Sequence, residues 1–177
     1  MAGLRSTDAA TIIVLGVLAT RVLFASQGTP ALSASDVKAA YLYRFGQFIE
    51  EPPRTGALTV CVVGDDAVAA SLEKLSREDP ATDKTLVRRD GPNAAGGGCG
   101  ILFVGHDEAH AAALLKSVGA SSTLVVGDNP AFLRAGGMVA FTLQDRKLHF
   151  SVNLANVQAA HLKLSSELLR HAAEVIQ

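Results

Sequence analysis

One pattern occurs three times along the chain and constrains its fold more than any other feature. A short apolar run rich in β-forming residues is followed by glycine, then by a polar residue, then by a stretch with helical periodicity. The three runs are residues 58–63 (LTVCVV), 101–104 (ILFV) and 124–126 (LVV), and residues 86–88 form a further short run. Short apolar strands that alternate with helices predict parallel strands in an α/β sheet.

The last third of the chain changes character. The runs 138–143 (MVAFTL) and 147–154 (KLHFSVNL) flank Gln144, Asp145 and Arg146. This spacing predicts an antiparallel hairpin with a three-residue turn.

Helices are expected at both ends of the mature chain. Ser35 and Asp36 form a cap signal before a helix that runs up to Pro52, with its apolar residues on one face. Residues 155–177 read as helical, with Ser165 or Ser166 capping a separate last helix. The predicted fold class is therefore α/β: a mixed sheet with parallel βα units, a C-terminal antiparallel hairpin and flanking helices.

The N-terminus has the pattern of a targeting segment. Residues 11–19 (TIIVLGVLA) are a compact apolar block, which Arg21 separates from the following residues. A membrane span needs roughly 20 apolar residues, so this shorter block is typical of a secretory signal peptide, with an uncleaved anchor as the alternative. We assign residues 1–28 to the signal peptide and the start of a linker, with an open boundary, and residues 29–177 to a single domain. The mature protein is expected in the periplasm.

Charge and cysteine content narrow the function classes. The formal net charge is -1 and no block of Lys or Arg is present, which argues against nucleic-acid binding. The chain has two cysteines, Cys61 and Cys99. In an oxidising compartment they are a candidate disulfide, whereas in a reducing cytosol they would be buried thiols.

The glycine-rich stretch around Cys99 does not fit a phosphate-binding loop. Such a loop follows a strand and opens a helix, because the amides at the helix N-terminus bind the phosphate. Here the glycines at 96, 97, 98 and 100 precede a strand, so we interpret them as a flexible connector. Neither a Walker motif, nor G-x-S-x-G, nor C-x-x-C occurs, and we assign no catalytic residue.

The string HDEAH, residues 106–110, resembles a zinc-binding helix only in its histidine spacing. Asp107 stands where the zincin pattern has glutamate and is expected to cap the helix, which leaves His106 outside it. We therefore assign no metal and no other cofactor. A metal enzyme that uses His106 and His110 is the weakest of three functional hypotheses.

Polar residues follow the predicted parallel strands. Asp65, Asp66, Asp128 and the pair His106-Asp107 would lie at the carboxyl ends of the strands, the edge where open α/β sheets bind ligands. The alternative is that these residues cap the following helices. Two further candidates for partner contact are the exposed charges Arg44, on the first helix, and Arg170, on the last one; a solvated helix face explains them equally well.

Five strings carry a family resemblance. They are VKAAYLYRFGQFIEEPP (37–53), LTVCVVGDD (58–66), CGILFVG (99–105), LVVGDNPAFLRAGGMVAFTLQDRKLHFSVNL (124–154) and AAHLKLSSELLRHAAEV (159–175). In this order they resemble the YfiR-like family of exported bacterial proteins over nearly all of the mature chain. The resemblance implies a non-enzymatic repressor that binds the periplasmic part of an inner-membrane diguanylate cyclase, so that its release raises cyclic di-GMP and promotes biofilm formation.

The resemblance also implies partners and a crosslink. A peptidoglycan-associated outer-membrane lipoprotein sequesters the repressor in some systems, and family members form homodimers. It further implies a disulfide between Cys61 and Cys99. Some members have a second disulfide, and this chain lacks the cysteines for it.

The alternative function is a periplasmic small-molecule-binding module at the carboxyl edge of the strands, around Asp65, Asp66 and Asp128.

Overall fold

The computed structural model describes residues 32–51, 56–78, 85–89, 98–105, 108–119 and 121–177. The predicted signal peptide lies outside these residues. Leu32–Gln177 form one compact unit. None of the helices in the described part of the chain is long and apolar enough to cross a membrane.

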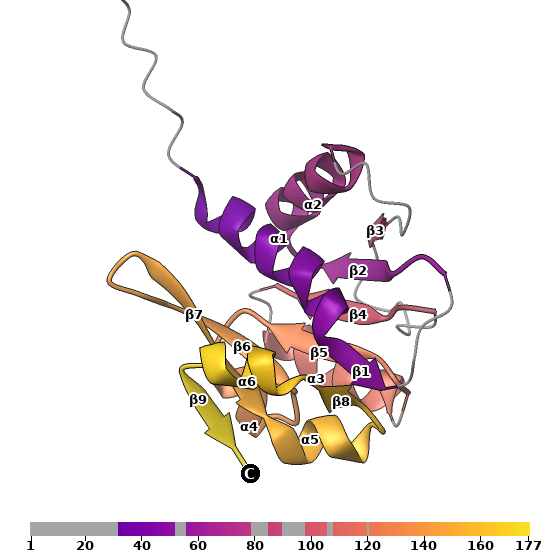
Figure 1. Cartoon of the computed structure of the whole chain (residues 1–177), viewed down its shortest axis with the longest axis vertical. Coiled ribbons are helices and arrows are strands. Elements are labelled where there is room, and N and C mark those ends of the chain that lie inside the picture. Colours follow the sequence, from indigo (N-terminus) through magenta and orange to yellow (C-terminus); the bar gives the residue numbers. More distant parts are fainter. Residues whose placement is uncertain (1–31, 52–55, 79–84, 90–97, 106–107, 120) are drawn as a thin grey trace, which may run out of the picture. The chain divides into compact units, whose positions relative to one another are not determined.

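A seven-stranded mixed sheet organises this unit (Figure 1). In spatial order its strands are β3 (Leu86–Arg89), β2 (Thr59–Val63), β4 (Ile101–Val104), β5 (Leu124–Gly127), β6 (Val139–Gln144), β7 (Lys147–Asn153) and β9 (Glu174–Ile176). The first five are parallel, β7 runs antiparallel to β6, and β9 is parallel to β7. The predicted α/β fold class with parallel units and an antiparallel hairpin is confirmed.

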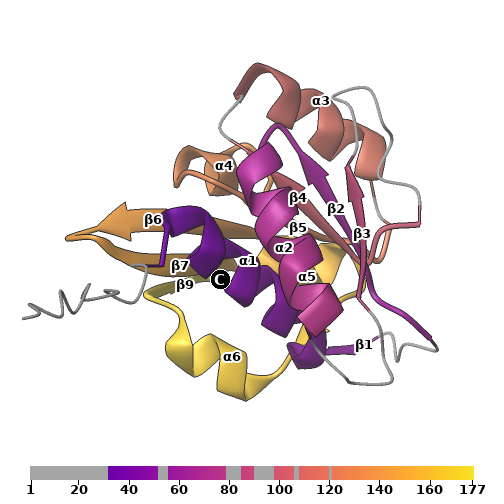
Figure 2. The same cartoon turned by 90° about the horizontal axis from the view of Figure 1, so that it is seen from above.

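The sheet is wound in two directions. From β2 the chain passes through α2 (Asp66–Glu78) to β3 on one side, whereas from β4 it passes through α3 (Glu108–Val118) to β5 and through α4 (Ala131–Arg134) to β6 on the other. Because parallel crossovers are right-handed, α2 and the pair α3 and α4 cover opposite faces (Figure 2). The winding direction therefore reverses between β2 and β4.

The first helix, α1 (Ala34–Phe45), is capped two residues earlier than expected. Ser33 is its N-cap: the Ser33 hydroxyl accepts from the Asp36 amide at 3.1 Å, and the Asp36 carboxylate accepts from the Ser33 amide at 3.0 Å. This reciprocal capping box satisfies two amide donors that a cap at Ser35 would leave open.

The expected helix up to Pro52 is wrong beyond Phe45. The chain continues as the 3₁₀ turn η1 (Gly46–Phe48) and strand β1 (Ile49–Glu51). Strand β1 pairs antiparallel with β8 (Lys163–Leu164), which is more than one hundred residues away. This distant partner, invisible to local periodicity, overrides the helical pattern.

Aromatic side chains attach α1 to the antiparallel half of the sheet. Phe45 packs on Phe150 of β7 with ring centroids 5.2 Å apart and on Phe141 of β6 at 5.9 Å. Tyr41 lies 5.6 Å from Phe150. Contacts of this kind stabilise the core beyond the area that they bury.

The β6–β7 turn is shorter than predicted. Gln144 pairs with Lys147 in the ladder, so only Asp145 and Arg146 form the turn, with φ values of 50° and 61°. Two central residues with positive φ indicate a type I′ turn, which matches the twist of the strands. The three-residue turn is wrong because the ladder extends by one further pair.

The C-terminal segment is not one helical stretch. It comprises α5 (Leu154–Ala159), strand β8, α6 (Ser166–His171) and strand β9. His161 adopts a left-handed φ of 56°, its amide donates to Gln158 and the Leu162 amide donates to Val157, which is a Schellman ending of α5. Ser165 caps α6 through the Leu168 amide at 3.2 Å.

Candidate functional site

Three charged side chains meet at the carboxyl end of the parallel strands. The Lys38 ammonium on α1 lies 2.7 Å from Asp128 Oδ2, after β5, and 3.9 Å from Asp65 Oδ2, after β2. Their side chains are only 13%, 14% and 19% exposed, respectively. We call these three residues the edge cluster. With two carboxylates for one ammonium, it carries a net negative charge in a half-buried position.

Local hydrogen bonds explain how the two carboxylates are oriented. Asp65 Oδ1 accepts from the Val68 amide at 3.0 Å, so Asp65 caps α2 while its other oxygen faces Lys38. Near the start of α4, Asn129 Oδ1 accepts from the Phe132 amide at 3.1 Å, a bond of the same three-residue span. Asp128 therefore does not cap that helix and bonds the Lys38 ammonium instead.

Lys38 was missing from the candidates predicted from the sequence. It lies four residues before Leu42 and seven before Phe45, and both of these side chains are buried. Residues at this spacing share one face of a helix. A lysine in the apolar stripe of α1 was therefore a signal for a half-buried ion pair.

The loops that follow β2 and β4 touch each other through their main chains, at the point where the winding of the sheet reverses. Gly64 follows β2, Gly105 follows β4, and the Gly105 amide donates to Val63 O at 2.7 Å. A Cβ on Gly105 would come within 2.5 Å of the Gly64 carbonyl oxygen. Ligands of open α/β sheets bind at this reversal point. Among the described residues, Lys38 of α1 and the close approach of the two glycines take up part of this place.

Asp66 belongs to a different group of charges. Its Oδ1 lies 3.0 Å from Arg89 Nη1 on β3, and Arg89 Nε lies 2.9 Å from Glu73 Oε1 on α2. The hydrogen bond from Arg89 lowers the pKa of Glu73, and the hydrogen bond to Glu73 raises the pKa of Arg89. The Asp66 side chain is 95% exposed, so these charges form a surface network apart from the edge cluster.

The remaining sequence candidates lie elsewhere. Arg44 on α1 and Arg170 on α6 are exposed, and neither takes part in the edge cluster. His106 and Asp107, as well as the side chain of His110, lie outside the described residues. The described part of the chain contains no group of three or more His, Cys, Asp or Glu side chains placed to hold a metal ion.

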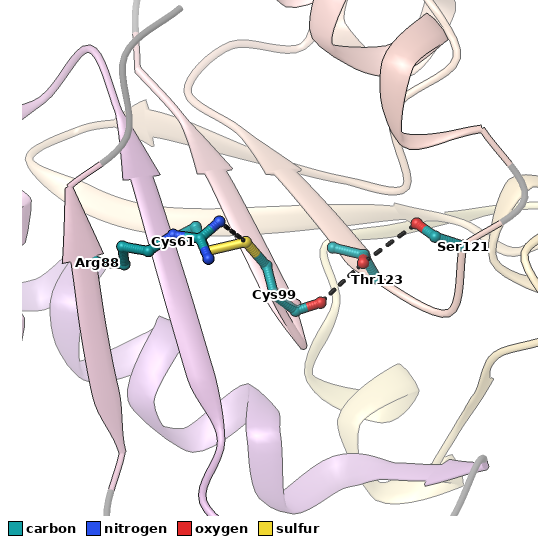
Figure 3. Close-up of a disulfide and its surroundings, with 5 residues drawn as sticks. All are labelled: Cys61, Arg88, Cys99, Ser121 and Thr123. Atoms are coloured by element: carbon teal, nitrogen blue, oxygen red, sulfur yellow. Dashed lines mark hydrogen bonds between the residues drawn. A yellow bond between two sulfur atoms is a disulfide. The ribbon is translucent and has the colours of Figure 1, made fainter. Parts of the chain in front are cut away.

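Cys61 and Cys99 form a disulfide (Figure 3). Cys61 is fully buried in β2, and Cys99 precedes β4 and is 6% exposed. The Arg88 guanidinium on the neighbouring β3 lies 3.2 Å from Cys99 Sγ. On the other side, the Thr123 hydroxyl donates to the Cys99 carbonyl at 2.7 Å and accepts from Ser121. The disulfide and these bonds attach the start of β4 to both of its neighbouring strands.

The connector glycines are described only in part. Gly98 adopts a φ of 81°, and a Cβ on Gly100 would come within 2.6 Å of Leu58 Cδ1. Gly100 therefore serves close packing beside the disulfide, a role that the sequence did not reveal. The glycines at 96 and 97 lie outside the described residues.

Solved structures with the same fold have little sequence in common with this chain. A conserved domain protein from Vibrio cholerae aligns with a TM-score of 0.54 and 11% identity, covering 81% of this chain and 60% of that one. An ABC domain in complex with L-Trp from Streptococcus pneumonia aligns with a TM-score of 0.57 and 9% identity, covering 80% and 60%. At these identities the likeness shows the fold alone, and this chain spans about 60% of the length of either structure.

The family comparison is more specific. None of the curated proteins matches the chain. The model of the YfiR/HmsC-like family matches residues 35–173, which span α1 to the residue before β9. This range includes the edge cluster, the disulfide and the β6–β7 hairpin. The chain belongs to the YfiR/HmsC-like family.

Proposed function

We propose that the protein is a non-enzymatic periplasmic regulator that binds the periplasmic part of a membrane-bound diguanylate cyclase and holds the cyclase inactive. The family match over residues 35–173 carries this proposal, because the family is regulatory and periplasmic. The regulator acts through unequal affinity: it shifts the cyclase toward the inactive state only if it binds that state more tightly. A shift from mostly active to mostly inactive requires roughly a 10⁴-fold preference.

Two features of the chain support a binding protein that works through its surface. At the reversal point of the sheet, the Lys38 ammonium bonds Asp128 and the main chains of Gly64 and Gly105 are in contact, so protein atoms take up part of the usual ligand position. The disulfide between Cys61 and Cys99 suits an oxidising compartment. A homodimer and sequestration by an outer-membrane peptidoglycan-associated lipoprotein are further parts of the proposal.

Deletion of the gene tests the regulator directly. Cellular cyclic di-GMP should rise in the deletion strain, and the full-length gene should restore the lower level. A version that starts after residue 28 should accumulate in the cytoplasm and fail to restore it, which serves as the matched control. Unchanged cyclic di-GMP in the deletion strain under several growth conditions would refute the proposal.

A small-molecule-binding module remains the second candidate, and the edge cluster favours it. The cluster has one carboxylate more than its ammonium can neutralise, at the edge where open α/β sheets bind ligands. An amine ligand would therefore meet a complementary charge. A thermal-shift screen with free amino acids and polyamines tests this function: stabilisation should occur with the natural chain and vanish with Asp65→Asn. Equal stabilisation of both proteins would exclude the edge cluster as the site.

A further inference from the structure

An apolar groove lies between the β6–β7 hairpin and the start of α1. Its volume is about 230 Å³, and it is lined by Leu32, Ala34, Val37, Leu143, Arg146 and Leu148. We call these six residues the hairpin groove. Leu32 is 78% exposed and Leu143 is 60% exposed, which makes them the two most exposed large apolar side chains in the described part of the chain. Two such side chains that line one groove make it a candidate for a docking site.

Beside the groove, the edge of β7 has no paired strand among the described residues. Strand β9 pairs with β7 only at Ser151–Asn153, and the hairpin extends past β9 (Figure 1). Asn153 donates its amide toward β6, to Met138 O, whereas Phe150 O accepts from Ala173 on the opposite side. Main-chain groups alternate in direction along a strand, so Leu148 directs its N–H and C=O away from β6 and toward the open edge.

Arg146 is held in a conformation that favours glycine. It occupies the second central position of the type I′ turn with a φ of 61°, where a side chain is strained and glycine is preferred. Asp145, at the first position, is a residue type that tolerates positive φ. Strain that persists at one residue beside a groove points to a role for that side chain. Glycine at this position would lack the arginine side chain, and Arg146 is one of the residues that line the groove.

We propose that the hairpin groove is the docking site for an extended, acidic and apolar segment of a protein partner. The segment pairs with the main chain of Leu148, extends an apolar side chain over Leu148 toward Leu143 and Leu32, and sets a carboxylate against Arg146. Strand addition of this kind takes its affinity from the main chain and its specificity from the side-chain pocket. This inference rests on the proposed function, in which the partner is the periplasmic part of the cyclase.

Charge complementarity selects this occupant. Arg146 and the neighbouring Lys147 place two cations at the end of the open edge, and Arg146 lines the groove itself. A carboxylate of the partner can accept two parallel hydrogen bonds from the Arg146 guanidinium. The apolar lining then receives the alternate side chain of the same strand, because side chains along a strand point to opposite faces.

The first test uses the purified mature chain and a short synthetic peptide of alternating leucine and glutamate. In amide NMR spectra, signals of residues 143–149 and 32–37 should shift at peptide concentrations below about 1 mM, the range expected of a weak isolated segment. The same peptide with lysine in place of glutamate should cause no shifts. Arg146→Gly and Leu143→Ser should each weaken binding roughly tenfold, the loss expected for one charged or apolar anchor.

Leu86→Ser provides the matched control. Leu86 lies on β3, the opposite edge strand of the sheet, and is 54% exposed, close to the value for Leu143. This variant should bind the acidic peptide as the natural chain does. Three results would overturn the proposal. The acidic peptide could cause no shifts of the protein's amide signals, it could shift the signals of β3 instead, or it could bind Arg146→Gly and Leu143→Ser as tightly as the natural chain.

Two other occupants would also overturn it. Binding to vesicles of phosphatidylethanolamine and phosphatidylglycerol that Leu143→Ser abolishes, without peptide shifts, would assign the groove to a membrane surface. A dimer of the natural chain that Leu143→Ser converts to a monomer in analytical ultracentrifugation would assign it to a second copy.

A cellular test separates this inference from the proposed function. In the deletion strain, the natural gene should lower cyclic di-GMP and the Arg146→Gly gene should not, although the purified variant melts at a higher temperature. If both genes lower cyclic di-GMP, the docking site is wrong and the regulator function stands. If neither gene has an effect, the proposed function fails, and the peptide titration alone decides whether the groove binds an acidic strand.

Discussion

The Lys38 ammonium lies 2.7 Å from Asp128 Oδ2, although 90 residues separate them in the sequence. This bond joins α1 to the carboxyl end of β5, beside the point where the winding of the sheet reverses. Asp128 is available for it because Asn129, and not Asp128, accepts the Phe132 amide at the start of α4. Of these two adjacent polar residues, Asn129 bonds the first turn of α4 and Asp128 bonds Lys38.

Lys38→Met should lower the free energy of unfolding by about 1–3 kcal/mol, because it leaves two half-buried carboxylates without their cation. Lys38→Met combined with Asp128→Asn should cost less than the sum of the two single changes. Urea unfolding of all three variants measures this coupling. Lys163→Met is the matched control: its ammonium pairs with Glu50 at 3.2 Å but is 60% exposed, so the loss should be clearly smaller than that of Lys38→Met. Equal losses at the two lysines would contradict a special role for the edge cluster.

Replacement of both cysteines by serine should destabilise the chain by about 3–4 kcal/mol, because the disulfide closes a loop between positions 38 residues apart. The reduced natural chain should show a similar loss, which separates the effect of the crosslink from that of the serine side chains. Thermal unfolding with and without reductant provides the measurement. Two free thiols in material isolated from the periplasm would show that the crosslink does not form there.

Acid should weaken the junction of α1 and α2. Hydrogen bonds from Ser33 and then Ser71 lower the pKa of Asp36 below its ordinary value of 3.8. Because the folded pKa is the lower one, this stabilisation is present above about pH 4, where the carboxyl is ionised in both states, and is lost as the pH falls through the folded pKa. Ser71→Ala should therefore make the melting temperature fall less steeply below pH 4. An unchanged acid limb would show that the Ser71 bond does not contribute.

Gly105→Ala should destabilise the domain by about 1–3 kcal/mol, the usual cost of forcing an extra methyl group into a packed site. The new Cβ would approach the Gly64 carbonyl carbon to 2.8 Å and its oxygen to 2.5 Å, and these are main-chain atoms that cannot rotate away. Gly119→Ala serves for comparison, since its Cβ would meet nothing closer than 4.0 Å and only its φ of 53° opposes the change. Chemical unfolding should rank Gly105→Ala as the more damaging variant.

Arg146→Gly should raise the free energy of unfolding by about 0.5–1 kcal/mol, because glycine adopts the positive φ of the type I′ turn without strain. Arg146→Lys keeps the strain and should leave stability within about 0.5 kcal/mol of the natural chain. Thermal unfolding of the two variants side by side distinguishes the outcomes. A destabilised Arg146→Gly would show that the arginine side chain contributes packing that outweighs its strain.

Much of the fold could be predicted from local sequence. The apolar runs at 58–63, 101–104 and 124–126 became β2, β4 and β5, because three to six β-forming residues between turn signals leave few alternatives. The helical stretches after the first two of these runs became α2 and α3. Errors occurred where two distant segments meet: β1 pairs with β8, and β9 pairs with β7.

The sequence by itself determined which segments are strands and which are helices in the parallel units, and it placed Asp65 and Asp128 at the carboxyl edge of the sheet. It did so because periodicity and turn chemistry act over a few residues. Only the tertiary structure decided that Lys38 joins these two carboxylates, that Asp66 turns to Arg89 instead, and that Arg146 stands in a strained turn beside a groove. These relationships depend on the order and register of the strands and on the packing of α1, which arise only when the whole chain has folded.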